Sequence, residues 1–140
     1  MTYEEAYAKA LRLLNVRFLS EKELRQKLMR SGAGDAVIDD VVQTLQEERF
    51  LDDLRLAYQV YAYYARKGQY GHAYIVNKLR RRALPIPEDV ERPDELTVAE
   101  QLVAKKFACE EDKRKIARYL QNRGFAPYVI RDIVQNWYVQ

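Results

Sequence analysis

Apolar residues recur with one spacing around two glycines of this 140-residue chain. Each glycine has apolar residues eight and four positions before it and six, nine, ten and thirteen positions after it. The residues around Gly32 are Leu24, Leu28, Ile38, Val41, Val42 and Leu45, and those around Gly124 are Ile116, Leu120, Ile130, Ile133, Val134 and Trp137. Spacings of three and four residues place side chains on one face of an α-helix, and glycine commonly ends a helix. The sequence therefore predicts two copies of a helix, a glycine stop and a second helix.

A third, incomplete copy of this pattern lies between the other two. Ile75, Leu79 and Ala83 take the places of the first two apolar residues and the glycine. The positions where the next helix should have its apolar face hold Asp89, Arg92, Pro93 and Leu96. We therefore predict an all-α chain of three tandem three-helix repeats, in which the middle repeat is degenerate in its last helix. Because each repeat buries its apolar stripe against its neighbours, the repeats should form an elongated, curved helical array.

The expected repeats span residues 1–50, 51–96 and 97–140 and together form one elongated domain. Three pairs have the spacing of a capping box, in which a hydroxyl and a carboxylate bind the first backbone N–H groups of a helix: Thr2 with Glu5, Ser20 with Glu23, and Thr97 with Glu100. Helices are expected at about 3–16, 21–31, 35–48, 52–67, 71–83, 97–108, 111–123 and 127–138. The acidic, proline-rich segment 85–96 should be a loop with one or two turns. No stretch alternates with the period of two that a sheet requires.

The composition places few limits on function. A net charge of +3 and a pI near 8.9 tilt the chain only mildly toward an acidic partner. Its single cysteine, Cys109, excludes an intrachain disulfide and is consistent with a reducing compartment. No segment resembles a signal peptide, and no apolar run approaches the ~18 residues needed to span a bilayer. We expect a cytoplasmic protein that does not contact a membrane.

Charge is polarised in the middle of the chain. Between Arg66 and Leu84 there is no Asp or Glu, whereas acidic residues dominate from Pro85 to Glu100. The basic residues of the first segment are Arg66, Lys67, Lys78, Arg80, Arg81 and Arg82. They are candidates to bind DNA phosphate or an acidic protein surface. The alternative is that Arg80, Arg81 and Arg82 form a solvated helix end and pair with the acidic segment that follows.

Six of the eleven tyrosines lie between Tyr58 and Tyr74, among these basic residues. Tyrosine near a cation can stack on nucleobases or anchor a protein interface. Tyr61 and Tyr64 share a helical stripe with apolar residues, so we interpret them as packing residues. Tyr63 and Tyr70 lie off that stripe and are the better candidates for a binding surface.

The residues that enzymes use for catalysis are scarce in this sequence. His72 is the only histidine, and its place at a helix start favours a solvated or capping role. Cys109 is best interpreted as a small, partly buried residue. The acidic pairs mostly stand where helix caps are expected, and no glycine-rich phosphate loop occurs. We expect no enzymatic activity, no cofactor and no metal site.

Several short segments, spread over nearly the whole chain, occur in a distinctive order. They are residues 20–28, residues 50–53 followed by Arg55 and Ala57, Gly71 with Ile75 and Leu79, and residues 115–116 with Leu120 and residues 123–125. Their order and spacing resemble the RecX family of regulatory proteins. The resemblance implies a protein that binds the RecA recombinase in the groove of its filament on DNA. It also implies suppression of strand exchange, ATP hydrolysis and co-protease activity, and hence a role in DNA repair, homologous recombination and the SOS response.

Three interpretations of function follow. The first is a monomeric modulator of the RecA filament, since a long array of repeats suits a long filament groove. The second is a helical-repeat protein that binds nucleic acid directly through the basic run 66–82, with Tyr63 or Tyr70 stacking on bases. The third is a scaffold for an unrelated partner.

Overall fold

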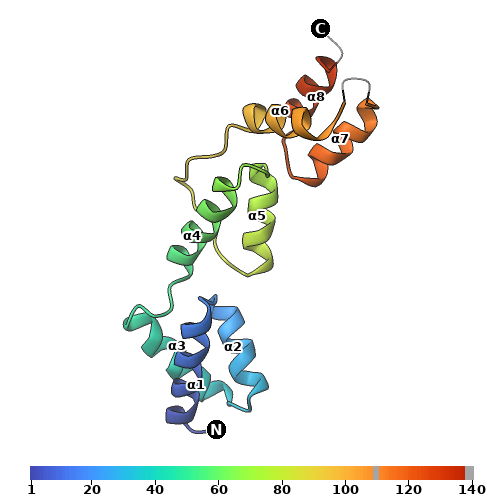
Figure 1. The fold of residues 1–140 in the computed structure, drawn as a ribbon. Coiled ribbons are helices and arrows are strands. Elements are labelled where there is room, and N and C mark those ends of the chain that lie inside the picture. Colours follow the sequence, from blue (N-terminus) through green and yellow to red (C-terminus); the bar gives the residue numbers. More distant parts are fainter. Residues whose placement is uncertain (109–110, 138–140) are drawn as a thin grey trace. The chain divides into compact units, whose positions relative to one another are not determined.

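The computed structural model describes residues 1–108 and 111–137, and within these residues the chain is helical and contains no strand. Figure 1 shows the helices in chain order. They are α1 (Tyr3–Val16), α2 (Glu21–Arg30), α3 (Asp35–Glu47), α4 (Asp53–Arg66), α5 (His72–Arg81), α6 (Glu95–Lys106), α7 (Lys113–Asn122) and α8 (Pro127–Gln135). The all-α prediction is confirmed, and so is the missing last helix of the middle repeat, because residues 84–94 contain no helix. Cys109 lies outside the described residues.

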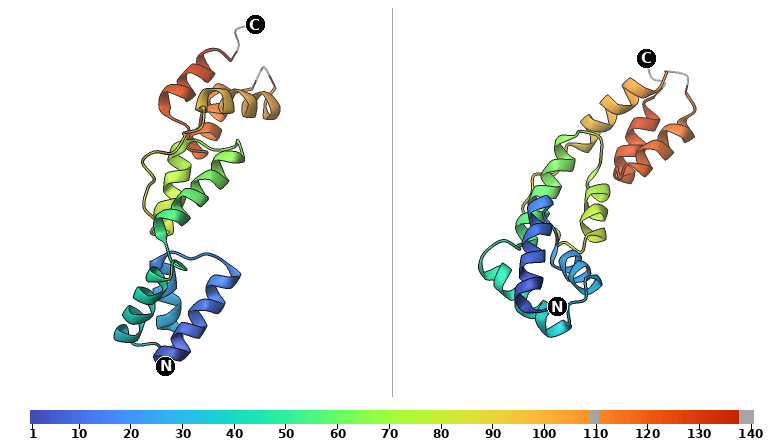
Figure 2. Two further views of the ribbon diagram at one scale, coloured as in Figure 1. Left: turned by 90° about the vertical axis from the view of Figure 1, so that its left-hand side faces the viewer. Right: turned by 60° about the horizontal axis from the view of Figure 1, so that its bottom comes forward.

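The chain divides into two compact units. Unit 1 contains Met1–Gln59 with Leu79–Pro87, and unit 2 contains Val60–Lys78 with the described residues from Glu88 onward. Two of the boundaries therefore fall within α4 and α5, and the third falls in the segment between α5 and α6. In unit 1, α1, α2 and α3 pack around one apolar core; in unit 2, α6, α7 and α8 pack around another (Figures 1 and 2).

The repeated apolar positions form these two cores. Leu24, Leu28, Val41 and Leu45 are fully buried in unit 1, and Ile38 and Val42 are nearly so. In unit 2, Ile116, Leu120 and Ile133 are buried, and Ile130, Val134 and Trp137 pack against them while half-buried. The spacing in the sequence thus identified which residues face inward.

The three copies of the pattern also end their first helix in the same way. The residue after the glycine position donates its N–H to the carbonyl five residues earlier, from Ala33 to Leu28, from Leu84 to Leu79 and from Phe125 to Leu120. This is the bond of a Schellman motif, which needs a residue with positive φ. Gly32 has φ 100° and Gly124 has φ 79°, and Ala83 adopts φ 57° at the same position.

Two of the three predicted capping boxes are present, at Thr2 with Glu5 and at Ser20 with Glu23. The third prediction is wrong. Helix α6 begins two residues before Thr97, and its N-cap is Asp94, whose carboxylate accepts from the N–H and the hydroxyl of Thr97. Aspartate is at least as good an N-cap as threonine, so the helix extends to the first suitable residue after Pro93.

Candidate interaction surface

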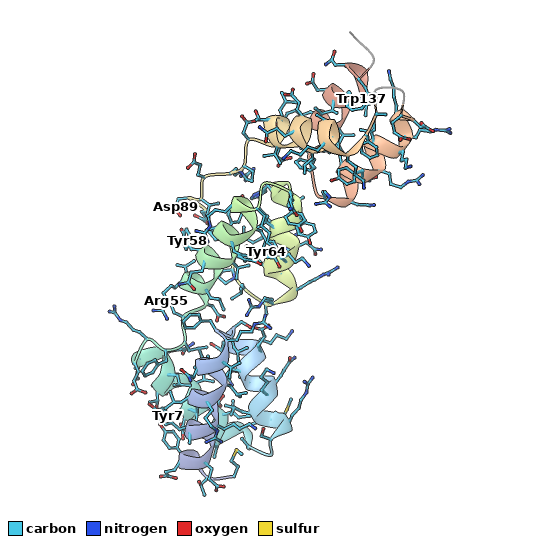
Figure 3. All side chains as sticks on the ribbon, viewed as in Figure 1. Tyr7, Arg55, Tyr58, Tyr64, Asp89 and Trp137 are labelled. Atoms are coloured by element: carbon cyan, nitrogen blue, oxygen red, sulfur yellow. The ribbon has the colours of Figure 1, made fainter. Side chains whose placement is uncertain are left out.

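Aromatic rings from five parts of unit 2 form two groups, which Arg123 joins. Tyr63 and Tyr64 come from α4, Tyr70 from the loop after it, Tyr74 from α5, Phe107 from the end of α6 and Tyr119 from α7. The rings of Tyr70 and Tyr74 are parallel, with centroids 4.0 Å apart. Tyr64 meets both edge-on at 5.8 and 6.0 Å, and its side chain is labelled in Figure 3. Edge-to-face and offset-stacked pairs at these distances are favourable.

Four cations lie against the faces of these rings. The Nζ of Lys67 is 4.7 Å from the ring centroid of Tyr63, and the Nζ of Lys78 is 5.2 Å from that of Tyr74. The guanidinium of Arg123 lies 5.5 Å from Tyr70 and 4.8 Å from Tyr119, so it joins the two groups. Lys106 lies 5.4 Å from Tyr119. All are within the range of cation–π attraction.

We call this set the cation–tyrosine strip. It consists of Tyr63, Tyr64, Tyr70, Tyr74, Phe107, Tyr119, Lys67, Lys78, Lys106 and Arg123.

No cation of the strip forms an ion pair within the described part of the chain. Cations elsewhere do. Arg25 bonds Asp39 at 2.7 Å, Arg82 bonds Glu23 at 2.9 Å and Arg114 bonds Asp112 at 3.3 Å. Among the described residues, no carboxylate therefore neutralises the positive charge of the strip.

A close approach between two glycines holds the strip together. The N–H of Gly71 donates to the carbonyl of Arg123 at 2.8 Å. A β-carbon on Gly71 would overlap the carbonyl group of Gly124, and one on Gly124 would overlap the backbone of Tyr74. The start of α5 thus lies directly on the turn between α7 and α8, which brings Arg123 beside Tyr70.

Glu95 fastens the same junction from a third segment. One carboxylate oxygen accepts from the N–H of His72 at 3.0 Å, and the other accepts from the N–H of Ala126 at 2.8 Å. Both N–H groups belong to helix starts, which have no partner within their own helix. A single side chain from α6 therefore caps α5 and α8 together.

His72 differs from its predicted solvated or capping role. Its ring is half-buried, and Nδ1 lies 2.7 Å from the hydroxyl of Tyr61, which is 2% exposed. Burial, followed by the positive charge of Arg92, lowers the pKa of His72. Burial likewise raises the pKa of Tyr61. The pair is a packing contact within unit 2, and the interpretation of Tyr61 as a packing residue is confirmed.

The predicted basic run is divided between the two units. Lys67, Lys78, Tyr63 and Tyr70 belong to the strip, and Arg66 is exposed at the last turn of α4 in the same unit. Arg80, Arg81 and Arg82 belong to unit 1. Arg80 and Arg81 are exposed, whereas Arg82 is half-buried and its guanidinium contacts other residues of unit 1.

Arg82 pairs with Glu23 of α2 rather than with the acidic segment that follows it in the chain. Its guanidinium also donates to the carbonyl of Phe18 at 2.9 Å. Burial alone would raise the pKa of Glu23, but the hydrogen bonds from Arg82 and from the Ser20 backbone lower it overall. Arg82 therefore has a structural role in unit 1.

Sequence reasoning missed the half of the strip that comes from the third repeat. Phe107, Tyr119, Lys106 and Arg123 lie more than 30 residues from Tyr74, and no local pattern connects them with it. The sequence feature that could have indicated this contact is the pair Gly71 and Gly124, because glycine permits two backbones to approach closely.

Other kinds of site find no support among the described residues. No group of three or more His, Cys, Asp or Glu side chains is placed to hold a metal ion. No helix in this part of the chain is long and apolar enough to cross a membrane.

The fold defines an all-α protein built from three-helix repeats, and comparisons with known proteins identify its family. A family model described as "RecX, first three-helix domain" matches residues 6–45. The regulatory protein RecX of Trichlorobacter lovleyi is 30% identical over 146 residues, which cover 94% of this chain and 94% of the relative. That of Pelodictyon phaeoclathratiforme is 32% identical over 125 residues, covering 83% and 78%. This chain belongs to the RecX family of regulatory proteins.

Solved structures show the same fold. The crystal structure of RecX from Lactobacillus salivarius has a TM-score of 0.75 to this chain at 18% sequence identity, and it covers 99% of this chain and 97% of the other. A second crystal structure of a regulatory protein RecX has the same TM-score and identity, with 95% of this chain covered.

Proposed function

We propose that this protein binds the RecA–DNA filament and inhibits or modulates its recombinase, ATPase and co-protease activities. Membership of the RecX family, with similarity across most of the chain, is the observation that carries this proposal. In the cell the protein would act as a monomer in the cytoplasm, in DNA repair, homologous recombination and the SOS response.

The structure is compatible with a role that needs binding and no catalysis. A modulator acts by binding one state of its target more tightly than another, and the size of its effect is set by that difference in affinity. An unneutralised cationic surface is suited to a target that displays DNA phosphate. The cation–tyrosine strip is such a surface.

Co-sedimentation tests the binding step. RecA filaments assembled on single-stranded DNA with a non-hydrolysable nucleotide are pelleted with increasing amounts of this protein. We expect the protein to pellet with the filaments and to saturate, and to pellet much less with RecA alone. A protein that stays in the supernatant at every ratio, while its far-UV circular dichroism shows the folded state, would contradict the proposal.

A further inference from the structure

We propose that the cation–tyrosine strip is a stacking site for the unpaired bases of single-stranded DNA. The proposal rests on the proposed function, because it names the component of the filament that this surface contacts. Tyr63, Tyr70 and Tyr74 would stack on bases, and Lys67, Lys78 and Arg123 would contact the adjoining phosphates.

The ring faces are covered by movable groups. Tyr63, Tyr70 and Tyr74 each have a lysine or arginine over one face, at 4.7, 5.5 and 5.2 Å. A lysine head on a long, flexible stem can move to a phosphate at little cost, and this movement frees the ring face for a base. Arg123 also donates to the carbonyl of Gln69 at 3.3 Å, so its movement costs that hydrogen bond as well. Tyr63 is 51% exposed, so its ring is reachable without any change in the fold.

The charge around the strip favours a polyanion. Its cations face rings instead of carboxylates, and the sequence holds no Asp or Glu between Arg66 and Leu84. An anionic ligand would therefore meet positive charge without a competing acidic side chain from this segment. Alternation of cations and rings is the arrangement by which proteins follow a single strand, with phosphates on the cations and bases on the rings.

Ring faces select a single strand over a duplex. In a duplex the faces of the bases are already stacked on one another, and only their edges are open in the grooves. The strip offers tyrosine rings with centroids 4.0 to 6.0 Å apart along its row. Unpaired bases can stack on such rings, whereas a duplex can contact only the cations.

The test measures binding to DNA in the absence of RecA. Fluorescence anisotropy follows titration of this protein into a short dye-labelled oligothymidylate, into an abasic strand with the same number of phosphates, and into a duplex of equal length. We expect the oligothymidylate to bind more tightly than both others. Equal affinity for the abasic strand would overturn the proposal, because it would show that phosphates alone are recognised.

Two matched pairs of variants locate the site. Tyr63→Leu keeps an apolar side chain but removes the ring, and we expect it to weaken oligothymidylate binding by roughly 5- to 150-fold, the range for loss of one base stack. Tyr128→Leu, at a tyrosine that is 65% exposed but outside the strip, should leave binding unchanged. Lys67→Gln should reduce the salt dependence of binding by about one phosphate contact, and Arg131→Gln should not.

The proposed function and this proposal can fail separately. If Tyr63→Leu leaves oligothymidylate binding intact but weakens co-sedimentation with RecA filaments, the strip contacts protein and the stacking site is wrong. If the wild-type protein binds oligothymidylate as expected but not the filament, the proposed function is wrong and the strip still binds single-stranded DNA.

Discussion

At the scale of single residues, Ala83 occupies a backbone conformation that its counterparts in the other repeats fill with glycine. Its φ of 57° matches the positive φ of Gly32 and Gly124, and all three positions are followed by the same helix-ending hydrogen bond. A residue with a β-carbon pays a steric cost there of about 1–2 kcal/mol. The middle repeat therefore keeps the geometry of the motif at some loss of stability.

Replacing Ala83 by glycine should stabilise the protein. The relief of steric strain exceeds the larger backbone entropy that glycine adds to the unfolded chain, so we expect a gain of about 1 kcal/mol in the free energy of unfolding. Urea unfolding followed by circular dichroism measures it. The matched control is Gly32→Ala, which should lose a similar amount, since no atom contacts the position and only its φ of 100° opposes the substitution. A destabilised Ala83→Gly variant would contradict the shared motif.

At the scale of helices, the start of α5 is fixed on the turn between α7 and α8. Gly71 and Gly124 allow the two backbones to touch, and Glu95 caps α5 and α8 from α6. This junction brings Arg123 to Tyr70 of the middle repeat, and the same guanidinium lies over Tyr119 of α7.

Gly71→Ala should therefore cost about 1–3 kcal/mol of stability, because the new methyl group overlaps backbone atoms that cannot move independently. It should also weaken any binding that depends on the strip. The control is Gly34→Ala at the start of α3, where an added β-carbon meets nothing within 4 Å and the loss should stay below about 1 kcal/mol. Urea unfolding of both variants makes the comparison. Equal losses of stability would mean that the close approach of Gly71 and Gly124 does not set the junction.

The helices were largely predictable from local patterns, and the strip was not. The spacing of residues such as Leu28 and Leu120 predicts a buried helical face, and the capping boxes at Thr2 and Ser20 predict helix starts. Local reasoning failed at Thr97, where Asp94 was an equally good cap closer to Pro93. The strip joins residues from the middle and third repeats. Their contact depends on backbone packing between distant segments, which the periodicity of apolar residues does not predict.

Tyr64 and Arg82 show the limit of reasoning from one helix at a time. Tyr64 lies on an apolar stripe, as expected of a packing residue, yet its ring packs against other tyrosines of a partly exposed row. Arg82 belongs to a basic run in the sequence, but it forms an ion pair with Glu23, which lies 59 residues before it. Because of this ion pair, Arg82 is not available to bind a partner. Charge and periodicity identify candidates, and tertiary partners decide which of them remain available.

At the scale of the whole molecule, the chain has the cores of its outer repeats, a middle repeat without its third helix, and a cationic aromatic surface in unit 2. These features and its family support a protein that works by binding. We infer that the proposed regulation of RecA would come from contacts between this protein and the filament.

ATP hydrolysis by preformed RecA filaments on single-stranded DNA, measured while this protein is titrated in, tests that inference most directly. We expect hydrolysis to fall at protein concentrations well below that of RecA, since a bound modulator would affect neighbouring protomers of the filament. Hydrolysis that stays unchanged up to equimolar protein, with this protein folded throughout, would contradict a role as a regulator of RecA.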